Sequence, residues 1–367
     1  MSNLVIYRKY RPKTFSEVIG QEHVITTVTN ALKEDIVSHG YLFSGPHGCG
    51  KTTIARLLAK ALNCLERKPG EFEPCCKCSS CLEINQGNAI DLIEMDAASN
   101  RGIDEIRELK EGIRFRPSKS KYKVFIIDEV HMITKEAANA LLKTLEEPPS
   151  HAVFILATTE IHKMIPTILS RCQRFDFRKL RLPEITKRLE MILKKEGILY
   201  EKEALDLIAL QAMGAQRDAE SLLDEAITFS AGKIEKETIQ VLLGLADKQS
   251  VFKFLDFLSE KNPKLAIDFI NEMMFKGVDL KEFIKSLIEY LRQILLLKID
   301  ANTENPLFFS LTEEEKQRLN SLVNSFSDNE IKNIIEKFME AENTMRYASL
   351  IQLPLELAIV DVCSKSQ

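Results

Sequence analysis

The sequence predicts an α/β domain built on a parallel sheet, followed by two helical domains. Residues 1–178 alternate short apolar β-type runs with helical patterns, which is typical of a parallel sheet with helices on both faces. Residues 179–243 and 244–367 carry apolar residues at helical spacing. A glycine-rich loop at residues 45–52 lies between a strand-like run and a good helix-forming run. We therefore expect a nucleotide-binding domain at the amino-terminal end of the chain.

Five runs are expected to form the sheet. Residues 123–128 and 152–158 are nearly continuous in apolar residues, as central strands buried on both faces should be. Residues 40–44, 89–94 and 173–177 are more mixed, so we expect them nearer the sheet edges. Residues 179–243 contain no clear β-type run and predict a small domain of about three helices.

Composition and charge limit the function classes. The net charge of −4 over 367 residues gives no global positive field, so any DNA contact must come from a local patch. No apolar run reaches the roughly 18–20 residues that span a bilayer, and the basic amino-terminal residues lack a signal-peptide core. We expect a cytoplasmic protein with reduced thiols, in which clustered cysteines indicate metal binding or catalysis.

The loop at residues 45–52 matches the pattern G-x-x-x-x-G-K-[ST] at every fixed position. Its glycines allow backbone N–H groups to point at phosphate oxygens, and the following helix N-terminus favours negative charge. Lys51 is expected to reach the β- and γ-phosphates of ATP, and Thr52 to give an oxygen ligand to Mg²⁺. The expected ATP contacts of this segment are Gly45, Pro46, His47, Gly48, Cys49, Gly50, Lys51, Thr52 and Thr53.

Two strand ends add polar groups. The run at residues 124–127 is apolar and is followed by Asp128 and Glu129. Asp128 can hold the Mg²⁺ shell, and Glu129 can orient and deprotonate the attacking water, which predicts hydrolysis as well as binding. Thr159 follows another strand, and ligands bind at strand carboxyl ends in open α/β sheets.

Four of the eight cysteines fit a metal pattern, namely Cys64 followed by Cys75-x-x-Cys78-x-x-Cys81. Four thiolates suit tetrahedral Zn²⁺ and leave no open position, so the site would be structural. Cys76 is adjacent and could replace Cys75. The repeated two-residue gap favours Cys75, but spacing alone leaves both open.

Together these motifs resemble the AAA+ clamp-loader ATPases, most closely the gamma/tau family of bacterial DNA polymerase III subunits. The matching segments are residues 7–15, 18–22, 45–52, 64–81, 127–132, 141–149, 157–159, 170–172 and 217–219. The resemblance is therefore dense over about the first 220 residues. It implies an AAA+ domain at 1–178 with a zinc module at 64–81, a helical lid at 179–243 and an all-α collar at 244–367.

The resemblance also implies roles for residues outside the loop. The expected adenine-pocket residues are Tyr7, Arg11, Val18 and Ile19. Thr159 corresponds to the sensor-1 position, Arg171 to an arginine finger that reaches the ATP of an adjacent subunit, and Arg217 to the sensor-2 arginine. The family often has serine where this chain has Ala215. A helix that opens near residues 97–101 is expected to face DNA.

The family function is to open a ring-shaped beta sliding clamp with ATP and to load it on primed DNA during replication. The implied partners are delta, delta-prime, other copies of the chain, the clamp and primed DNA, and ATP turnover is expected to be stimulated by DNA and clamp. Such subunits are grouped with DNA-directed DNA polymerases, a class of nucleotidyltransferase, although no polymerase active site lies in this chain.

Two other functions stay open at this point. The first is a DNA-remodelling motor on the same fold, such as a branch-migration helicase. The helical residues 246–367, without a β-hairpin pattern, count against it. The second is a scaffold that binds ATP and zinc without turnover.

Overall fold

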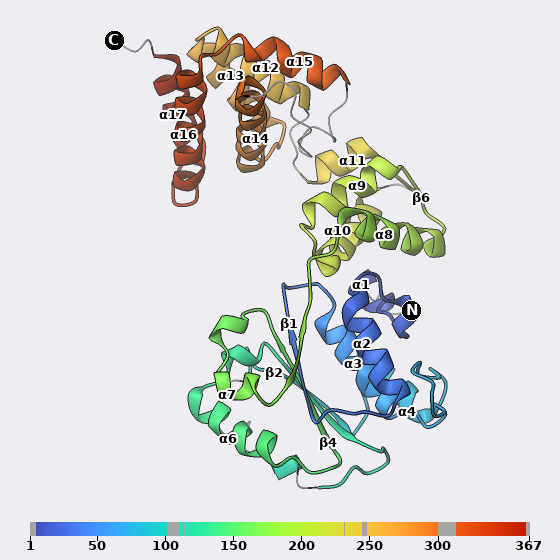
Figure 1. Cartoon of the computed structure of the whole chain (residues 1–367). Coiled ribbons are helices and arrows are strands. Elements are labelled where there is room, and N and C mark those ends of the chain that lie inside the picture. Colours follow the sequence, from blue (N-terminus) through green and yellow to red (C-terminus); the bar gives the residue numbers. More distant parts are fainter. Residues whose placement is uncertain are drawn as a thin grey trace. The chain divides into compact units, whose positions relative to one another are not determined.

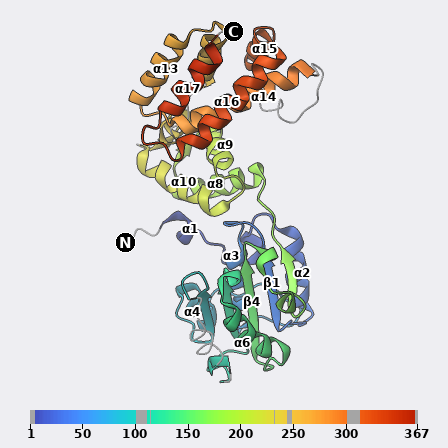
Figure 2. The same ribbon diagram turned by 90° about the vertical axis from the view of Figure 1, so that its left-hand side faces the viewer.

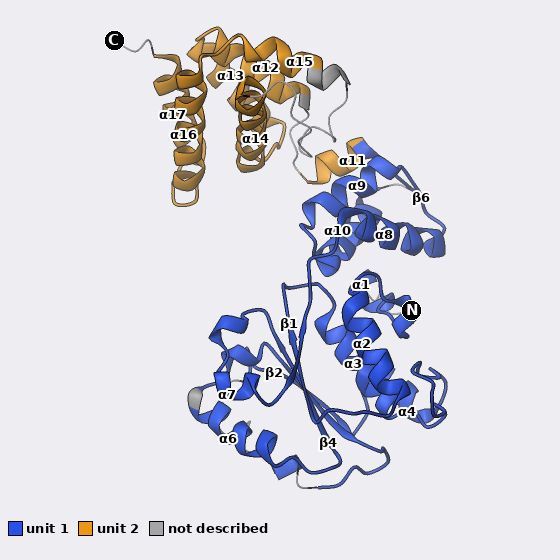
Figure 3. Cartoon of the chain, viewed as in Figure 1, with its two compact units in different colours: residues 1–236 blue, residues 237–367 orange. Residues whose placement is uncertain are grey.

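The computed structural model describes residues 5–100, 111–113, 115–230, 232–243, 248–299 and 313–364. The chain divides into two compact units, residues 1–236 (unit 1) and 237–367 (unit 2), which are coloured separately in Figure 3. The division of the first 243 residues into two domains stays a prediction. Arg101, in the helix expected to face DNA, lies outside the described residues.

Unit 1 contains a five-stranded sheet with the order β2-β3-β4-β1-β5, in which every pairing is parallel (Figure 1). The strands are β1 (Gly40–Ser44), β2 (Leu92–Asp96), β3 (Lys123–Asp128), β4 (Ala152–Thr158) and β5 (Gln173–Asp176). The predicted fold class is confirmed. Strand β2 starts later than the predicted 89–94 because the Asp91 carboxylate turns away to accept three backbone N–H groups from residues 118–120.

Strand β1 lies inside the sheet, so the expectation that it lies nearer an edge is wrong. It pairs with β4 on one side and β5 on the other, and all five of its residues are buried. Its mixed composition reflects close packing, since a Cβ on Gly40 would lie 3.0 Å from Sγ of Cys172. A small residue is therefore required in a buried position.

Helices cover both faces of the sheet. They are α2 (Glu22–Lys33) and α3 (Lys51–Leu62) on one face, and α6 (Lys135–Glu146) and α7 (Pro166–Leu169) on the other (Figure 1). Side chains alternate accordingly: Tyr41 and Phe43 pack with α2 and α3, whereas Leu42 packs with α6. This two-sided burial explains why the central strands contain almost only apolar residues.

Shorter elements connect the sheet to its surroundings. They are α1 (Ile6–Lys9), η1 (Phe15–Glu17), α4 (Ser79–Gln86), η2 (Val130–Met132) and η3 (Ile161–Lys163). After the sheet follow α8 (Leu182–Glu196), α9 (Lys202–Gln211), α10 (Gln216–Phe229) and α11 (Lys236–Leu242). Two strands of two residues each, β6 (Leu199–Tyr200) and β7 (Lys233–Ile234), also pair here. They are too short to show an alternating pattern, which is why the sequence did not predict them.

Unit 2 is helical throughout the part that the structure describes (Figures 1 and 2). Its helices are α11 (apart from Lys236), α12 (Lys248–Ser259), α13 (Pro263–Phe275), α14 (Leu280–Ile299), α15 (Glu313–Val323), α16 (Asp328–Met345) and α17 (Leu353–Cys363). Phe254 lies at the centre of its core, with ring centroids 5.2 Å from Phe283 and 6.1 Å from Phe338. Among the described residues, no helix of either unit is both long and apolar enough to cross a membrane.

Candidate nucleotide site and metal centre

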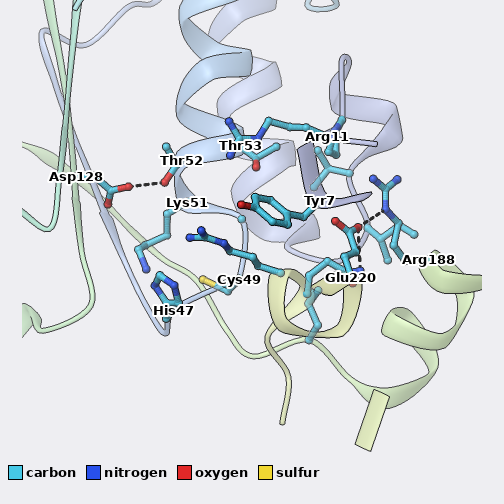
Figure 4. A pocket seen from close by; sticks show the side chains of 18 of the residues that line it. Tyr7, Arg11, His47, Cys49, Lys51, Thr52, Thr53, Asp128, Arg188 and Glu220 are labelled. Carbon is cyan, nitrogen blue, oxygen red and sulfur yellow. Dashed lines mark hydrogen bonds and ion pairs between the residues drawn. The ribbon is translucent and has the colours of Figure 1, made fainter. Parts of the chain in front are cut away.

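A cavity of about 350 Å³ lies in unit 1, where the loop after β1 meets the carboxyl ends of β2 and β3 (Figure 4). Its size is typical of a small-molecule site. The predicted site residues that line it are Tyr7, Arg11, Val18, Ile19, His47, Gly48, Cys49, Gly50, Lys51, Thr52, Thr53, Asp128, Glu129 and Arg217. Gly45, Pro46, Thr159 and Arg171 are not among its lining residues.

The glycine-rich loop takes a backbone conformation that favours glycine. Gly50 has φ +102°, a left-handed conformation that favours glycine. Lys51 begins α3, is only 5% exposed, and donates from Nζ to the carbonyl oxygens of Gly45 (2.7 Å) and Pro46 (2.8 Å). The ammonium group is therefore held inside the loop next to the cavity. Gly45 and Pro46 act on the site through these carbonyl groups.

Thr52 and Asp128 meet across the cavity floor. Thr52 Oγ1, in the first turn of α3, donates to Asp128 Oδ2 at the end of β3 over 2.7 Å. A hydroxyl and a carboxylate at this separation are the oxygen ligands that Mg²⁺ uses at phosphate sites. Asp96 also lines the cavity, and its carboxylate accepts from the Ala98 N–H and the Ser99 hydroxyl. The residues present therefore fit a magnesium ion.

Glu129 is held by a neighbouring strand. Its backbone is left-handed (φ +47°), and its N–H donates to Asp128 Oδ1. Its Oε2 accepts from Thr159 Oγ1 at 2.8 Å and from Thr159 N at 3.2 Å, and His131 Nδ1 lies 3.4 Å away. A left-handed non-glycine residue is strained, and such strain persists only where the surroundings fix it. Thr159 therefore contacts the cavity through Glu129.

The residues after α9 form the opposite wall. The Gln216 N–H donates to the Gly48 carbonyl over 3.0 Å. The Arg217 guanidinium lies 4.9 Å from the centroid of the Tyr7 ring, and its hydrogen bond lowers the pKa of Tyr7. Tyr7 thus lies between the loop and the helix that carries Arg217 (Figure 4).

The sequence did not predict several residues of the cavity wall. They are Pro12, Glu17, Asp96, Ala98, Leu180, Arg188, Gln216 and Glu220. Arg188 Nε and Glu220 Oε1 form a buried ion pair at 3.0 Å, with only 7% and 6% of their side chains exposed. Burial raises the pKa of Glu220, and Arg188 opposes this shift. Nothing in the sequence indicated this ion pair, because two charged residues 32 positions apart in a helical segment resemble ordinary surface residues.

Arg171 does not contact the cavity of its own chain. It follows α7 and donates to the Thr167 carbonyl (2.8 Å), to Ser170 Oγ (3.1 Å) and to Glu146 Oε1 (2.7 Å). Its side chain is 31% exposed. A role at the nucleotide of a neighbouring subunit stays a prediction.

Four cysteines gather between α3 and α4. The Sγ atoms of Cys64, Cys75, Cys78 and Cys81 all lie within 4.8 Å of one another, and those of Cys75 and Cys81 are 3.9 Å apart. Tetrahedral zinc with Zn–S bonds of about 2.3 Å requires S–S separations of about 3.8 Å. Burial and the neighbouring sulfur atoms raise the pKa of Cys81. The donor set therefore fits zinc.

Cys76 points away from this cluster. Its backbone is left-handed (φ +59°), and its Sγ lies 3.2 Å from the carbonyl oxygen of Lys13, to which it donates. Cys75 instead accepts the N–H of Cys78 at 3.2 Å on its sulfur. The structure therefore places Cys75, and not Cys76, among the four gathered cysteines.

Comparisons with known proteins agree with this architecture. Residues 20–181 match the model "DNA polymerase III, delta subunit", residues 184–232 match "DNA polymerase III clamp loader subunit, ATPase lid domain", and residues 234–367 match "DNA polymerase III subunits gamma and tau domain III". A variant of Thermotoga maritima RuvB has a TM-score of 0.50 at 19% identity, covering 68% of this chain and 78% of that one. This likeness shows the fold alone.

Relatives in sequence define the family. The chain is 42% identical over 366 residues to DNA polymerase III subunit tau of Bacillus subtilis (strain 168), covering 100% of this chain but 64% of that protein. It is 36% identical over 366 residues to DNA polymerase III subunit gamma of Buchnera aphidicola subsp. Acyrthosiphon pisum, covering 99% of both. The chain belongs to the gamma/tau family of DNA polymerase III clamp-loader subunits.

Proposed function

We propose that this chain is the ATP-hydrolysing subunit of a bacterial clamp loader, which opens the beta sliding clamp and loads it on primed DNA during replication. The observation that carries the proposal is the meeting of Thr52 and Asp128 at 2.7 Å, in a cavity that Lys51 and Glu129 also line. A site for binding alone has no use for Glu129, whereas hydrolysis requires a base near the γ-phosphate.

The binding step follows from the loop. The carbonyl oxygens that now accept from Lys51 Nζ are weaker partners than phosphate, so on ATP binding the ammonium exchanges them for β- and γ-phosphate oxygens. The N–H groups of the loop and of the α3 N-terminus bind the remaining oxygens. Thr52 and Asp128 hold Mg²⁺, which would neutralise charge on the phosphates. The adenine is enclosed by Tyr7, Arg11, Val18 and Ile19.

The hydrolytic step depends on Glu129. Its carboxylate accepts a proton from the attacking water, and Thr159 positions the carboxylate through the 2.8 Å hydrogen bond. Arg217 reads the bound nucleotide from α10. Arg171 acts at the nucleotide of a neighbouring copy, which is consistent with its location outside its own cavity.

The remaining roles concern assembly. We propose that Cys64, Cys75, Cys78 and Cys81 bind a structural zinc ion, since four thiolates leave no open coordination position. The helices of unit 2 form the collar that joins copies of the chain with delta and delta-prime. The assembled complex acts on the clamp and primed DNA in the cytoplasm, at the replisome.

The test is steady-state ATP turnover by the chain assembled with delta and delta-prime, with and without sliding clamp and primed DNA. We expect turnover that rises when clamp and primed DNA are both present. Tight nucleotide binding without phosphate release would instead identify a scaffold, and unwinding of duplex DNA by the chain alone would identify a remodelling motor.

A further inference from the structure

The amino-terminal segment of residues 5–19, here called the N-terminal strap, forms one wall of the nucleotide cavity. Six of its residues line the cavity, namely Tyr7, Arg11, Pro12, Glu17, Val18 and Ile19. Apart from the short turns α1 and η1, the strap has no regular structure. Two sets of contacts, at residues 9–10 and at residues 13–16, hold the strap to other segments of unit 1.

Residues 9 and 10 of the strap are bound to helix α8. Lys9 Nζ and Tyr10 Oη donate to Glu196 Oε1 over 2.6 and 2.8 Å. The Tyr10 carbonyl oxygen accepts from the Arg188 guanidinium. The helices that follow the sheet form one wall of the cavity, and these contacts join the strap to that wall.

Residues 13–16 of the strap are bound to the four-cysteine insertion. The N–H groups of Phe15 and Ser16 donate to the two carboxylate oxygens of Glu73, over 2.9 and 2.8 Å. The Phe15 ring, 1% exposed, packs against Phe72 at a centroid distance of 6.5 Å. Cys76 Sγ donates to the Lys13 carbonyl. Three residues of the insertion, at positions 72, 73 and 76, thus hold residues 13–16.

The insertion is itself fixed to the sheet domain. Arg67 donates from Nε to the Ala61 carbonyl at the end of α3 (2.8 Å), and from Nη1 to the Leu32 carbonyl at the end of α2 (2.9 Å). Its Nη1 also donates to the Glu71 carbonyl, two residues before Glu73. The cysteine cluster closes the same loop on its other side. The insertion therefore presents Glu73 from a rigid base.

We propose that the four-cysteine insertion anchors the N-terminal strap, with Glu73 as the positioning residue, so that the adenine side of the cavity is ordered before nucleotide binds. The proposal rests on the nucleotide binding proposed above. Charge-assisted hydrogen bonds from two backbone N–H groups to Glu73 order the strap before nucleotide binds. A cavity wall that is already ordered lowers the entropic cost of binding. Glu73 does not line the cavity, so we expect it to affect affinity and not the chemical step.

The experiment compares Glu73→Ala with Glu66→Ala in the complete chain. Glu66 is a carboxylate of the same insertion that lies 3.5 Å from Lys77 and is 49% exposed, so it is a matched control. Four quantities are measured: the Kd for a fluorescent ATP analogue with Mg²⁺, amide hydrogen exchange of residues 5–19, bound zinc, and kcat for ATP turnover. We expect Glu73→Ala to raise the Kd roughly tenfold, about 1.4 kcal/mol, and to speed exchange at residues 13–19. We expect Glu66→Ala to match the wild type, and the zinc content and kcat to be unchanged in both.

A second variant, Phe72→Ala, tests the same contact from its apolar side and should change Kd and exchange in the same direction. The proposal is overturned if Glu73→Ala and Phe72→Ala both bind nucleotide and exchange like Glu66→Ala. Loss of zinc from both would also overturn it, because these residues would then act in folding the insertion. A wild-type chain that binds no nucleotide would overturn the proposed function, while the exchange data would still show whether Glu73 anchors the strap.

Discussion

Glu129→Gln gives the sharpest test of the catalytic assignment. The amide has almost the size of the carboxylate, and its oxygen can still accept the 2.8 Å hydrogen bond from Thr159. The groups expected to bind phosphate, Lys51 and the loop N–H groups, are untouched. A positioned base contributes roughly 10²–10⁴-fold to a rate, which is about 2.7–5.4 kcal/mol at 1.36 kcal/mol per tenfold.

We therefore expect phosphate release at saturating ATP, with clamp and primed DNA present, to fall at least ~100-fold in Glu129→Gln. The equilibrium Kd for ATP should stay within about threefold of the wild type, because no binding contact is lost. Thr159→Val removes only the hydroxyl that holds Glu129, while the 3.2 Å bond from the Thr159 N–H remains. We expect it to reduce turnover about tenfold, near the value of one charge-assisted hydrogen bond. Turnover of Glu129→Gln within fivefold of wild type would refute the assignment.

Three further outcomes follow from the structure. Cys75→Ser should lose bound zinc, measured by atomic emission, and should have a lower Tm. Cys76→Ser should retain its zinc, because of these two cysteines only Cys75 has its sulfur in the cluster. Arg171→Ala should leave the Kd of the isolated chain within about threefold but reduce stimulated turnover of the assembled complex by roughly a thousandfold; unchanged turnover would exclude an arginine finger. Hydrogen bonds from Arg178 lower the pKa of Glu184 from 4.5 to about 2. Glu184→Gln should therefore lower the free energy of unfolding in urea by about 1–3 kcal/mol. This loss should have its full size above pH 4.5 and should vanish as the pH falls towards 2.

The half of the site that is expected to contact phosphate could be predicted from the sequence because its residues are nearly contiguous. A strand, a tight loop and a helix must follow one another to present N–H groups and Lys51, and this order is visible in the chain. Asp128 and Glu129 could be predicted for the same reason, since they directly follow an apolar strand. The hydrogen bond between Glu129 and Thr159 could not be predicted, because it depends on β3 and β4 being neighbours in the sheet.

The other half of the site arises from packing between distant segments. Arg188 and Glu220 could not be singled out among the 50 basic and 54 acidic residues of the chain, although they form one of the most buried ion pairs of the described residues. Spacing also could not decide between Cys75 and Cys76, because the left-handed backbone of Cys76 turns its sulfur towards Lys13. In each case the deciding property is an orientation, which the order of residues does not encode by itself.

The contact between the loop and α10 shows how the two halves depend on each other. A Cβ on Gly48 would lie 2.9 Å from Cβ of Ala215, so both positions require small residues for the backbones to meet. Alanine in place of the serine common in the family preserves this approach, and the Gln216 N–H then reaches the Gly48 carbonyl. The next residue, Arg217, is thereby directed to the Tyr7 ring. The loop thus contacts α10 through the Gln216–Gly48 hydrogen bond, and α10 contacts the strap through Arg217 and Tyr7, so the walls of the cavity are joined directly even though they come from distant parts of the sequence.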